Sequence, residues 1–159
     1  MTQAVWRIAT DTPFYTADDL SGAGAKATGG RWNGAGIPML YGSDTRALAC
    51  LETLVRLKAA SLPFNRYLVR IDVPDDIWAA AQLASASALP VGWDAEPAGL
   101  VSIDFGSRWA AARATCLLVV PSVIVPEECN ILFNPAHPDM TKLTATKVRR
   151  WLYDPRLGA

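Results

Sequence analysis

Five consecutive residues, Gly29-Gly30-Arg31-Trp32-Asn33, combine groups that suit an anionic ligand with a flat ring. The two glycines let the backbone approach a ligand closely. Arg31 offers a planar, permanently charged fork of donors that matches phosphate oxygens, and Trp32 can stack on an aromatic ring. A dinucleotide has both features. Taken alone, such a motif is more often a glycine turn beside an arginine in an ion pair, because short glycine motifs are frequent.

The residues around this motif predict a hairpin. Residues 31–33 and 38–42 each read as a short strand, and the glycines of 34–36 favour a turn between them. Such a hairpin would bring Arg31 and Tyr41 together. An aromatic ring beside a guanidinium again suits a nucleotide, although a strand tyrosine is equally often part of a core.

The segment 44–60 gives the clearest helix prediction in the chain. Its apolar residues recur at helical spacing, and Ser43 or Asp44 can cap its first amides. The helix carries Glu52, which either acts on a bound substrate or pairs with Arg56 across one turn.

The rest of the chain reads as short strands and helices joined by loops. Alternating or continuous apolar residues predict strands at 4–9, 67–73, 116–121 and 128–135. Helices are expected from Asp75 or Asp76 to Ala81 and from Ser102 to Ala114. The segments 16–30 and 84–99 are rich in small residues and are expected to be loops. The basic C-terminal residues are interpreted as a solvated helix face or a docking surface for an acidic partner segment: Lys142, Lys147, Arg149 and Arg150.

Composition limits the classes of function. A chain of 159 residues, 51% hydrophobic, fits one domain spanning residues 1–159. Fifteen basic residues balance fifteen acidic ones, which gives no overall field for nucleic acid or an anionic membrane. Residues 1–20 contain no apolar run, so a cytoplasmic protein is expected. The three cysteines lack CxxC spacing, so neither a disulfide framework nor a metal site is predicted.

The ordered set of motifs resembles the RES domain, the toxin half of bacterial RES/Xre toxin–antitoxin pairs. That family is named after an arginine, a glutamate and a serine, which correspond here to Arg31, Glu52 and Ser122. The resemblance covers most of the chain through further matches at Trp6-Arg7, Leu40-Tyr41, Gly106-x-x-Trp109 and Asn130-x-x-x-Asn134-Pro135-x-His137.

The resemblance implies a fold and a substrate. The expected fold is a compact α/β (α+β) domain with a central mixed, split β-sheet flanked by helices, similar to ADP-ribosyltransferase toxins. The expected substrate is NAD⁺, and the expected partner is a cognate Xre-type antitoxin. Family members hydrolyse or phosphorolyse NAD⁺, or transfer ADP-ribose to a protein, and thereby arrest growth.

The resemblance also suggests a role for individual residues. Glu52 would stabilise the positive charge that develops on the ribose when nicotinamide leaves. Arg31 would hold the pyrophosphate, Tyr41 would stack on nicotinamide, and Ser122 would bind a phosphate or the nicotinamide amide. Four further residues are expected either to shape the substrate pocket or to serve the fold alone: Trp32, Asn33, Asn130 and His137.

Alternatives remain at the level of function. The first hypothesis is cleavage of NAD⁺ with water or phosphate as acceptor, and the second is mono-ADP-ribosylation of a cellular protein. A third is a nucleotide-binding module without turnover. A Ser122/His137/Asp139 hydrolase is disfavoured because the glycine elbow that usually exposes such a serine is missing.

Overall fold

A seven-stranded mixed sheet organises the protein, with strand order β4-β5-β6-β2-β1-β3-β7. The computed structural model describes residues 1–57 and 62–158. Strands β4 and β5 are parallel, and every other neighbouring pair is antiparallel. In chain order the elements are β1 (Thr2–Thr10), α1 (Ala23–Thr28), β2 (Leu40–Ser43), α2 (Arg46–Leu54), β3 (Arg66–Pro74), α3 (Asp75–Ala79), β4 (Gln82–Leu83), α4 (Leu100–Ala112), β5 (Leu117–Pro121), β6 (Cys129–Phe133), the 3₁₀ helix η1 (Pro138–Lys142), β7 (Thr144–Trp151) and the 3₁₀ helix η2 (Pro155–Gly158).

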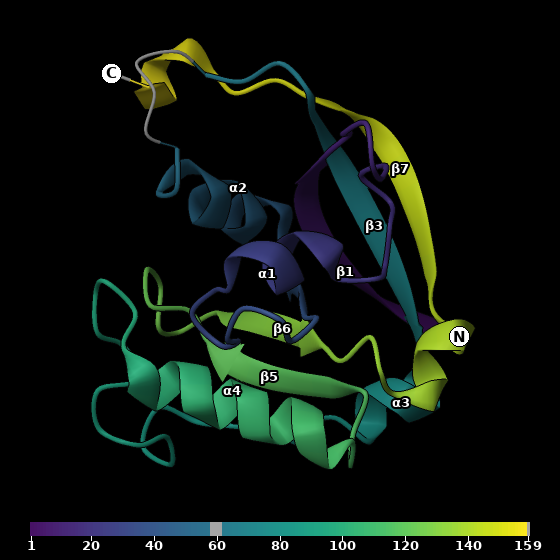
Figure 1. Cartoon of the computed structure of the whole chain (residues 1–159). Helices are drawn as coiled ribbons and strands as arrows, with labels where there is room; N and C mark the ends of the chain where they lie inside the picture. Colours follow the sequence, from purple (N-terminus) through teal and green to yellow (C-terminus); the bar gives the residue numbers. More distant parts are fainter. Residues whose placement is uncertain (58–61, 159) are drawn as a thin grey trace.

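The sheet is split between β1 and β2. These central strands pair only at Trp6 and Ser43, so the two halves of the sheet diverge from one point. Gly42 permits this crossing, because a Cβ there would lie 2.6 Å from Val5 Cγ1 and 3.2 Å from the Trp6 carbonyl oxygen. Helices α1 and α2 lie beside the opening between the halves (Figure 1). The predicted compact α/β fold with a mixed, split sheet and flanking helices is confirmed.

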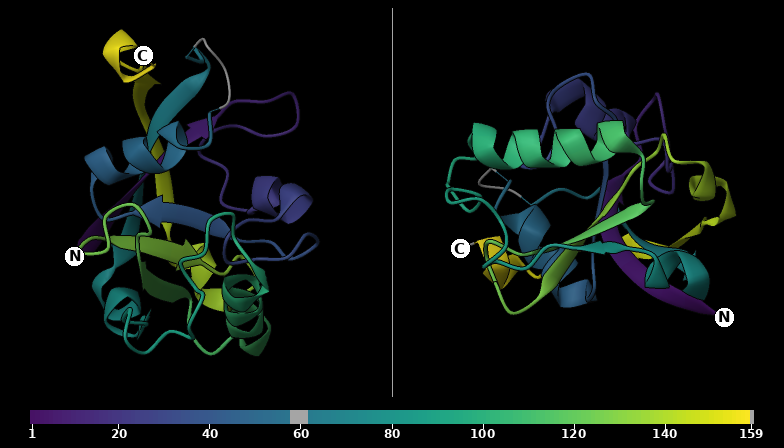
Figure 2. Two further views of the ribbon diagram at one scale, coloured as in Figure 1. Left: turned by 90° about the vertical axis from the view of Figure 1, so that its left-hand side faces the viewer. Right: turned by 90° about the horizontal axis from the view of Figure 1, so that it is seen from below.

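Each half of the sheet packs against its own helix, and a further core cluster spans both halves. Trp109 of α4 packs with Leu118 of β5 and Leu132 of β6, which places α4 against that half (Figure 2). In the other half, Ala49 of α2 packs with Trp6 of β1. The shared cluster includes Val5 of β1 and Phe133 of β6. Full burial of a large apolar side chain contributes about 1.5–3 kcal/mol, so these contacts also hold the two halves together.

Most of the predicted elements are present. The strands expected at 4–9, 67–73, 116–121 and 128–135 correspond to β1, β3, β5 and β6, with ends that differ by a few residues. The loop expected at 84–99 is also observed.

The helix expected over 44–60 is shorter and begins differently. It ends at Leu54, and residues 58–60 of the prediction lie outside the described residues. Its cap is Thr45, whose side chain accepts a hydrogen bond from the Leu48 amide. Ser43 and Asp44 do not cap it because their side chains bind Asn130 Oδ1 and the Cys129 amide on β6.

Two predictions around the glycine motif were wrong. The expected loop 16–30 contains α1, bracketed by Gly22 and Gly29 with φ of 70° and 72°. Residues 31–33 form no strand beside β2, because the Gly30 amide bonds the Asn33 carbonyl in a tight turn.

Three further elements differ from expectation. The basic C-terminal segment forms strand β7 against β3 rather than a helix face. Helix α4 starts at Leu100 after Gly99, so Ser102 is buried inside it and does not cap it. Helix α3 begins at Asp75 with Pro74 before it, and neither Asp75 nor Asp76 caps it through its side chain.

Candidate active site

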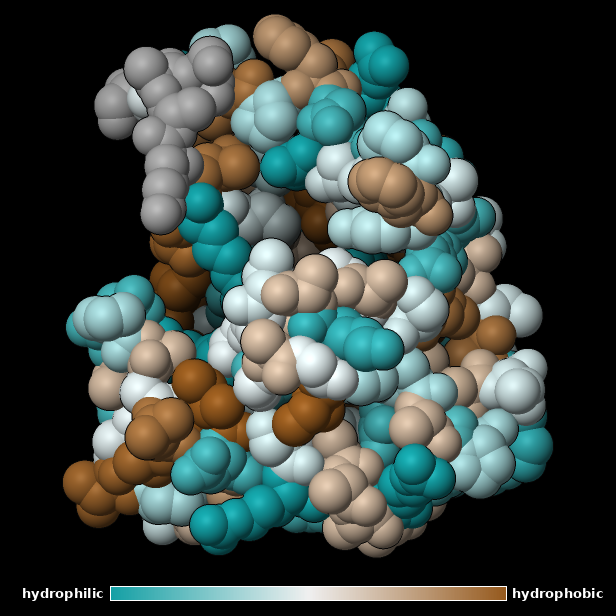
Figure 3. Space-filling view, in the orientation of Figure 1, coloured by the Kyte–Doolittle hydropathy of each residue, from teal (hydrophilic) through white to brown (hydrophobic). Residues whose placement is uncertain are grey.

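A cavity of about 520 Å³ opens where the two halves of the sheet diverge. Its walls come from β1, β2, α1, α2 and the loop after β1, and a hollow is visible there on the molecular surface (Figure 3). Pockets for small ligands and cofactors have volumes of this order. The charged and hydrogen-bonding side chains on its walls include Arg7, Tyr15, Asp19, Tyr41, Glu52, Arg56, Arg66 and Asn130.

The Glu52 carboxylate is fixed in the cavity wall by a chain of polar side chains. Its Oε1 atom accepts hydrogen bonds from Ser122 Oγ at 2.8 Å and from Asn130 Nδ2 at 2.6 Å. Asn130 in turn accepts a hydrogen bond from Ser43 Oγ at 2.8 Å. The carboxylate on α2 is therefore held by β6 and by the residue that follows β5, and β2 supports Asn130. Glu52 forms no ion pair with Arg56, so the alternative of a simple helical pair is not realised.

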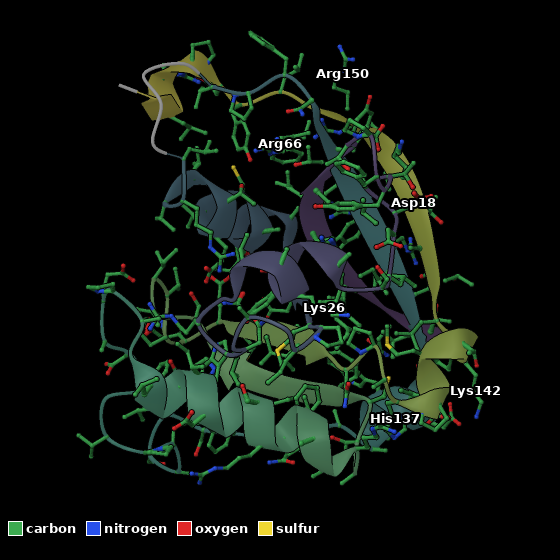
Figure 4. The ribbon with its side chains drawn as sticks, viewed as in Figure 1. Asp18, Lys26, Arg66, His137, Lys142 and Arg150 are labelled. Atoms are coloured by element: carbon green, nitrogen blue, oxygen red, sulfur yellow. The ribbon has the colours of Figure 1, made fainter. Side chains whose placement is uncertain are left out.

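Ser122 is a support for Glu52 rather than an exposed nucleophile. It lies directly after β5, is fully buried, and accepts hydrogen bonds from the amides of Ile124 and Val125. Its single hydroxyl hydrogen is donated to Glu52. His137 lies near the opposite end of the molecule, beside Lys142 (Figure 4), where its Nδ1 atom accepts a hydrogen bond from an amide of η1. The geometry of a Ser122/His137 hydrolase is absent.

Tyr41 is held by the glycine motif. Its hydroxyl donates to Asn33 Oδ1 at 2.5 Å and accepts from the Trp32 amide at 3.1 Å. Asn33 is fully buried and donates to the carbonyl oxygens of Ala25 and Ile37 at 2.8 and 3.0 Å. Burial raises the pKa of Tyr41 to about 12. The turn therefore fixes the tyrosine ring in the cavity wall by binding its hydroxyl.

Arg31 and Trp32 point away from the cavity. Arg31 donates to the carbonyl oxygen of Ala95 at 2.7 Å and pairs with Glu96 Oε2 at 2.7 Å. Trp32 is buried and stacks on Trp93 with ring centroids 6.2 Å apart. Both residues tie the turn to the loop 93–96, which matches the ion-pair interpretation of the motif and the core interpretation of Trp32.

Three arginines that were not among the predicted site residues line the cavity instead. Arg7 Nη1 donates to the Tyr41 carbonyl oxygen at 2.9 Å, and its Nε is buried without a partner in the described part of the chain. Burial lowers the pKa of Arg7 to about 10. The Arg56 guanidinium lies 5.7 Å from the Tyr41 ring centroid. Arg66, the first residue of β3, completes the set (Figure 4).

Sequence could have indicated one of these arginines. Arg7 stands between Trp6 and Ile8 in a strand, where a charged residue calls for an explanation. Arg56 and Arg66 carry no such signal, because charged residues near the end of a helix and the start of a strand are common.

Comparison with known proteins identifies the family. A family model described as the RES domain matches residues 4–154. The chain belongs to the RES family. This RES domain is 64% identical over 157 residues to the Prs ADP-ribosylating toxin of Sphingobium sp. (strain YBL2), a match covering 99% of this chain and 98% of that protein.

More distant relatives carry the name Toxin Res. The protein of Yersinia enterocolitica is 34% identical over 144 residues, covering 90% of this RES domain and 93% of the relative. The protein of Pseudomonas putida is 38% identical over 136 residues, covering 84% and 86%. The resemblance to RES toxins predicted from the sequence is confirmed.

The structure groups six of the eight predicted site residues into two sets and places the other two elsewhere. Glu52, Asn130 and Ser122 form one hydrogen-bonded cluster, and Tyr41, Asn33 and Trp32 form another. The two sets meet at the cavity through the side chains of Glu52, Asn130 and Tyr41. Arg31 is directed at the loop 93–96, and His137 lies outside the site.

Metal binding and membrane insertion find no support in the described part of the chain. Within residues 1–57 and 62–158, no group of three His, Cys, Asp or Glu residues is arranged to hold a metal ion. None of the helices in these ranges is both long and apolar enough to cross a membrane. The three cysteines are free thiols.

Proposed function

We propose that this RES domain is a toxin that cleaves the nicotinamide–ribose bond of NAD⁺ and transfers ADP-ribose to a cellular protein. The observation that carries the proposal is the Glu52 carboxylate, held by Ser122 and Asn130 in the wall of a cavity of about 520 Å³. The relative at 64% identity, named as an ADP-ribosylating toxin, supports transfer to a protein acceptor.

Glu52 is proposed as the catalytic group. When the bond between ribose and nicotinamide breaks, its electron pair leaves with the nicotinamide nitrogen, and neutral nicotinamide departs. Positive charge then develops on the ribose. A preorganised carboxylate beside the sugar stabilises that charge, and removal of one such interaction typically costs about 2.7–4 kcal/mol in barrier. In the described residues the hydrogen bonds to Glu52 reach only Oε1, which leaves Oε2 for the ribose.

Tyr41 is proposed to orient the nicotinamide ring. The nicotinamide of NAD⁺ carries a positive charge before cleavage, and such a ring is attracted to the face of a tyrosine. The hydroxyl of Tyr41 is already bound by Asn33 and Trp32, so a ligand would meet its ring, near which Arg56 also lies. In this proposal Asn33 and Trp32 position Tyr41, while Ser122 and Asn130 position Glu52.

Water and inorganic phosphate are the second candidates for the acceptor. The cavity is open to solvent, so either can reach the cation once nicotinamide has left (Figure 3). The toxin is further expected to be neutralised by a cognate Xre-type antitoxin, as the family resemblance implies.

The test is to incubate the purified protein with NAD⁺, with and without phosphate and a bacterial lysate, and to identify products by mass spectrometry. A modified lysate protein together with free nicotinamide supports transfer. ADP-ribose or its phosphate as the only product identifies water or phosphate as the acceptor. If NAD⁺ binds but stays intact in every mixture, the chain is a binding module and the proposal fails.

A further inference from the structure

Two cationic side chains flank Tyr41 in the cavity and lack an anionic partner. Arg7, on β1, donates a hydrogen bond to the main-chain carbonyl oxygen of Tyr41. Arg56, in the turn after α2, lies near the Tyr41 ring. Within residues 1–57 and 62–158, neither arginine forms an ion pair with a carboxylate. The two acidic side chains of the cavity form no ion pair with either arginine. Glu52 accepts hydrogen bonds from Ser122 and Asn130, and Asp19, whose charge acts to raise the pKa of Arg7, accepts hydrogen bonds from the Ser21 amide and hydroxyl.

This arrangement is unfavourable without a ligand. The Arg7 Nε atom is buried with its hydrogen-bonding capacity unused in the described part of the chain, and a buried donor without a partner costs free energy. A second guanidinium nearby adds repulsion between like charges. A bound anion would satisfy the unused donor and offset both charges, which explains why the cavity retains them.

We infer that Arg7 and Arg56 form a diphosphate-binding subsite, an inference that rests on the proposed function. The two arginines then take the role that the sequence suggested for Arg31. Guanidinium forks bind phosphate oxygens through paired, charge-assisted hydrogen bonds. Arg31 is already bonded to the loop 93–96, whereas Arg7 and Arg56 face the cavity.

The placement also fits a dinucleotide. Arg7, Arg56, Glu52 and Tyr41 all line the same cavity, so one ligand can contact all four. A diphosphate between Arg7 and Arg56 would place the attached ribose beside Glu52 and its nicotinamide beside the Tyr41 ring.

The experiment measures binding separately from turnover. Isothermal titration calorimetry with ADP and with adenosine compares the parent protein, Arg56→Gln and Arg7→Lys, with Arg46→Gln as a matched control. Arg46 lies on α2, where its guanidinium is 3.8 Å from the Trp6 ring centroid, and it is not among the residues that line the cavity. Thermal unfolding checks that each variant is folded, and the exposed position of Arg56 keeps that variant informative even if Arg7→Lys is unstable.

If Arg7 and Arg56 bind the diphosphate, Arg56→Gln should weaken ADP binding by about tenfold or more, because a charge-assisted hydrogen bond is lost. Adenosine binding should change by less than about twofold, because adenosine has no phosphate. Arg7→Lys keeps the charge but loses the fork and should weaken ADP binding as well, whereas Arg46→Gln should bind ADP like the parent.

The possible failures are distinguishable. ADP binding that is unchanged in folded Arg56→Gln and Arg7→Lys overturns the subsite, even if the parent cleaves NAD⁺. ADP binding that depends on both arginines in a protein that never cleaves NAD⁺ supports the subsite and overturns the proposed function.

Discussion

Ser122 Oγ donates a hydrogen bond to Glu52 Oε1 over 2.8 Å, although 70 residues separate them in sequence. The contact joins the end of β5 to helix α2 and brings two of the three residues that give the family its letters into direct contact. The third, Arg31, is connected to the site only through the turn that binds Tyr41.

Loss of the Ser122 hydroxyl should affect both stability and catalysis. In Ser122→Ala the amides of Ile124 and Val125 lose their acceptor, and Glu52 loses one of its two supports. We expect the free energy of unfolding to fall by about 1–3 kcal/mol. We also expect kcat for NAD⁺ cleavage to fall more than KM changes, because the residue acts through Glu52.

Urea unfolding and steady-state kinetics measure these two effects. The exposed Ser87→Ala is the matched control, and it should alter neither quantity. A Ser122→Ala protein with parental kcat would show that the hydrogen bond to Glu52 does not position the carboxylate.

Arg31→Lys separates a structural role from a role in binding. Lysine keeps the charge but cannot form the paired contacts to Ala95 and Glu96. We expect the variant to lose about 1–3 kcal/mol of unfolding free energy, as charged hydrogen bonds are lost, and to bind ADP with an affinity close to that of the parent. Calorimetry checks this, and a loss of ADP affinity as large as that of Arg56→Gln would restore Arg31 as the pyrophosphate ligand.

Gly106 brings α4 against the glycine motif. A Cβ at this position would collide with the Trp32 carbonyl group. Alanine normally stabilises a helix relative to glycine by about 0.5–1 kcal/mol, but here we expect Gly106→Ala to destabilise the protein by about 1–3 kcal/mol through overpacking. Denaturant unfolding measures the change.

Gly99→Ala provides the comparison for this substitution, because a Cβ there has no neighbour within 4 Å. Equal stability of the two variants would mean that α4 and residue 32 are not in close contact.

The Tyr41 hydroxyl links stability to alkaline pH. Burial raises its pKa from 10.0 to about 12, so the folded protein holds the proton more tightly than the unfolded chain. The protonated hydroxyl contributes its full share to the free energy of unfolding below pH 10, and this share is lost as the pH rises toward 12. Two pKa units correspond to roughly 3 kcal/mol.

Urea unfolding of the parent and of Tyr41→Phe, at a pH below 10 and at one near 12, isolates this contribution. The parent should lose more stability over the interval than the variant does. An equal loss would indicate that the hydroxyl titrates as freely in the folded state as in the unfolded chain.

The sequence correctly predicted the strands and helices that show a local pattern of apolar residues. Strand β3 alternates and α2 repeats apolar residues at helical spacing, and both are present. Strand β7 was missed because it lies at the sheet edge, where most of its residues face solvent and are polar or basic. Charged residues are usual on such edges, since they discourage pairing with other chains.

Within the site, the residues involved could be predicted better than the directions in which their side chains point. Glu52 and Tyr41 face the cavity because helix α2 and strand β2 fix their orientation. The direction of Arg31 is set by Trp93, Ala95 and Glu96, which lie more than sixty residues away in the chain. No local pattern reports such a contact, and the same holds for the convergence of Arg7 and Arg56 on Tyr41.

The decisive comparison is the rate of nicotinamide release from NAD⁺ by the parent protein and by Glu52→Gln, measured in a bacterial lysate that supplies protein acceptors. Glutamine retains an oxygen for the hydrogen bonds from Ser122 and Asn130 but lacks the negative charge. We expect parental unfolding behaviour with a rate lower by a factor on the order of 10²–10³. Nicotinamide release at the parental rate in a folded Glu52→Gln protein would contradict the assignment of Glu52 as the group that stabilises the ribosyl cation.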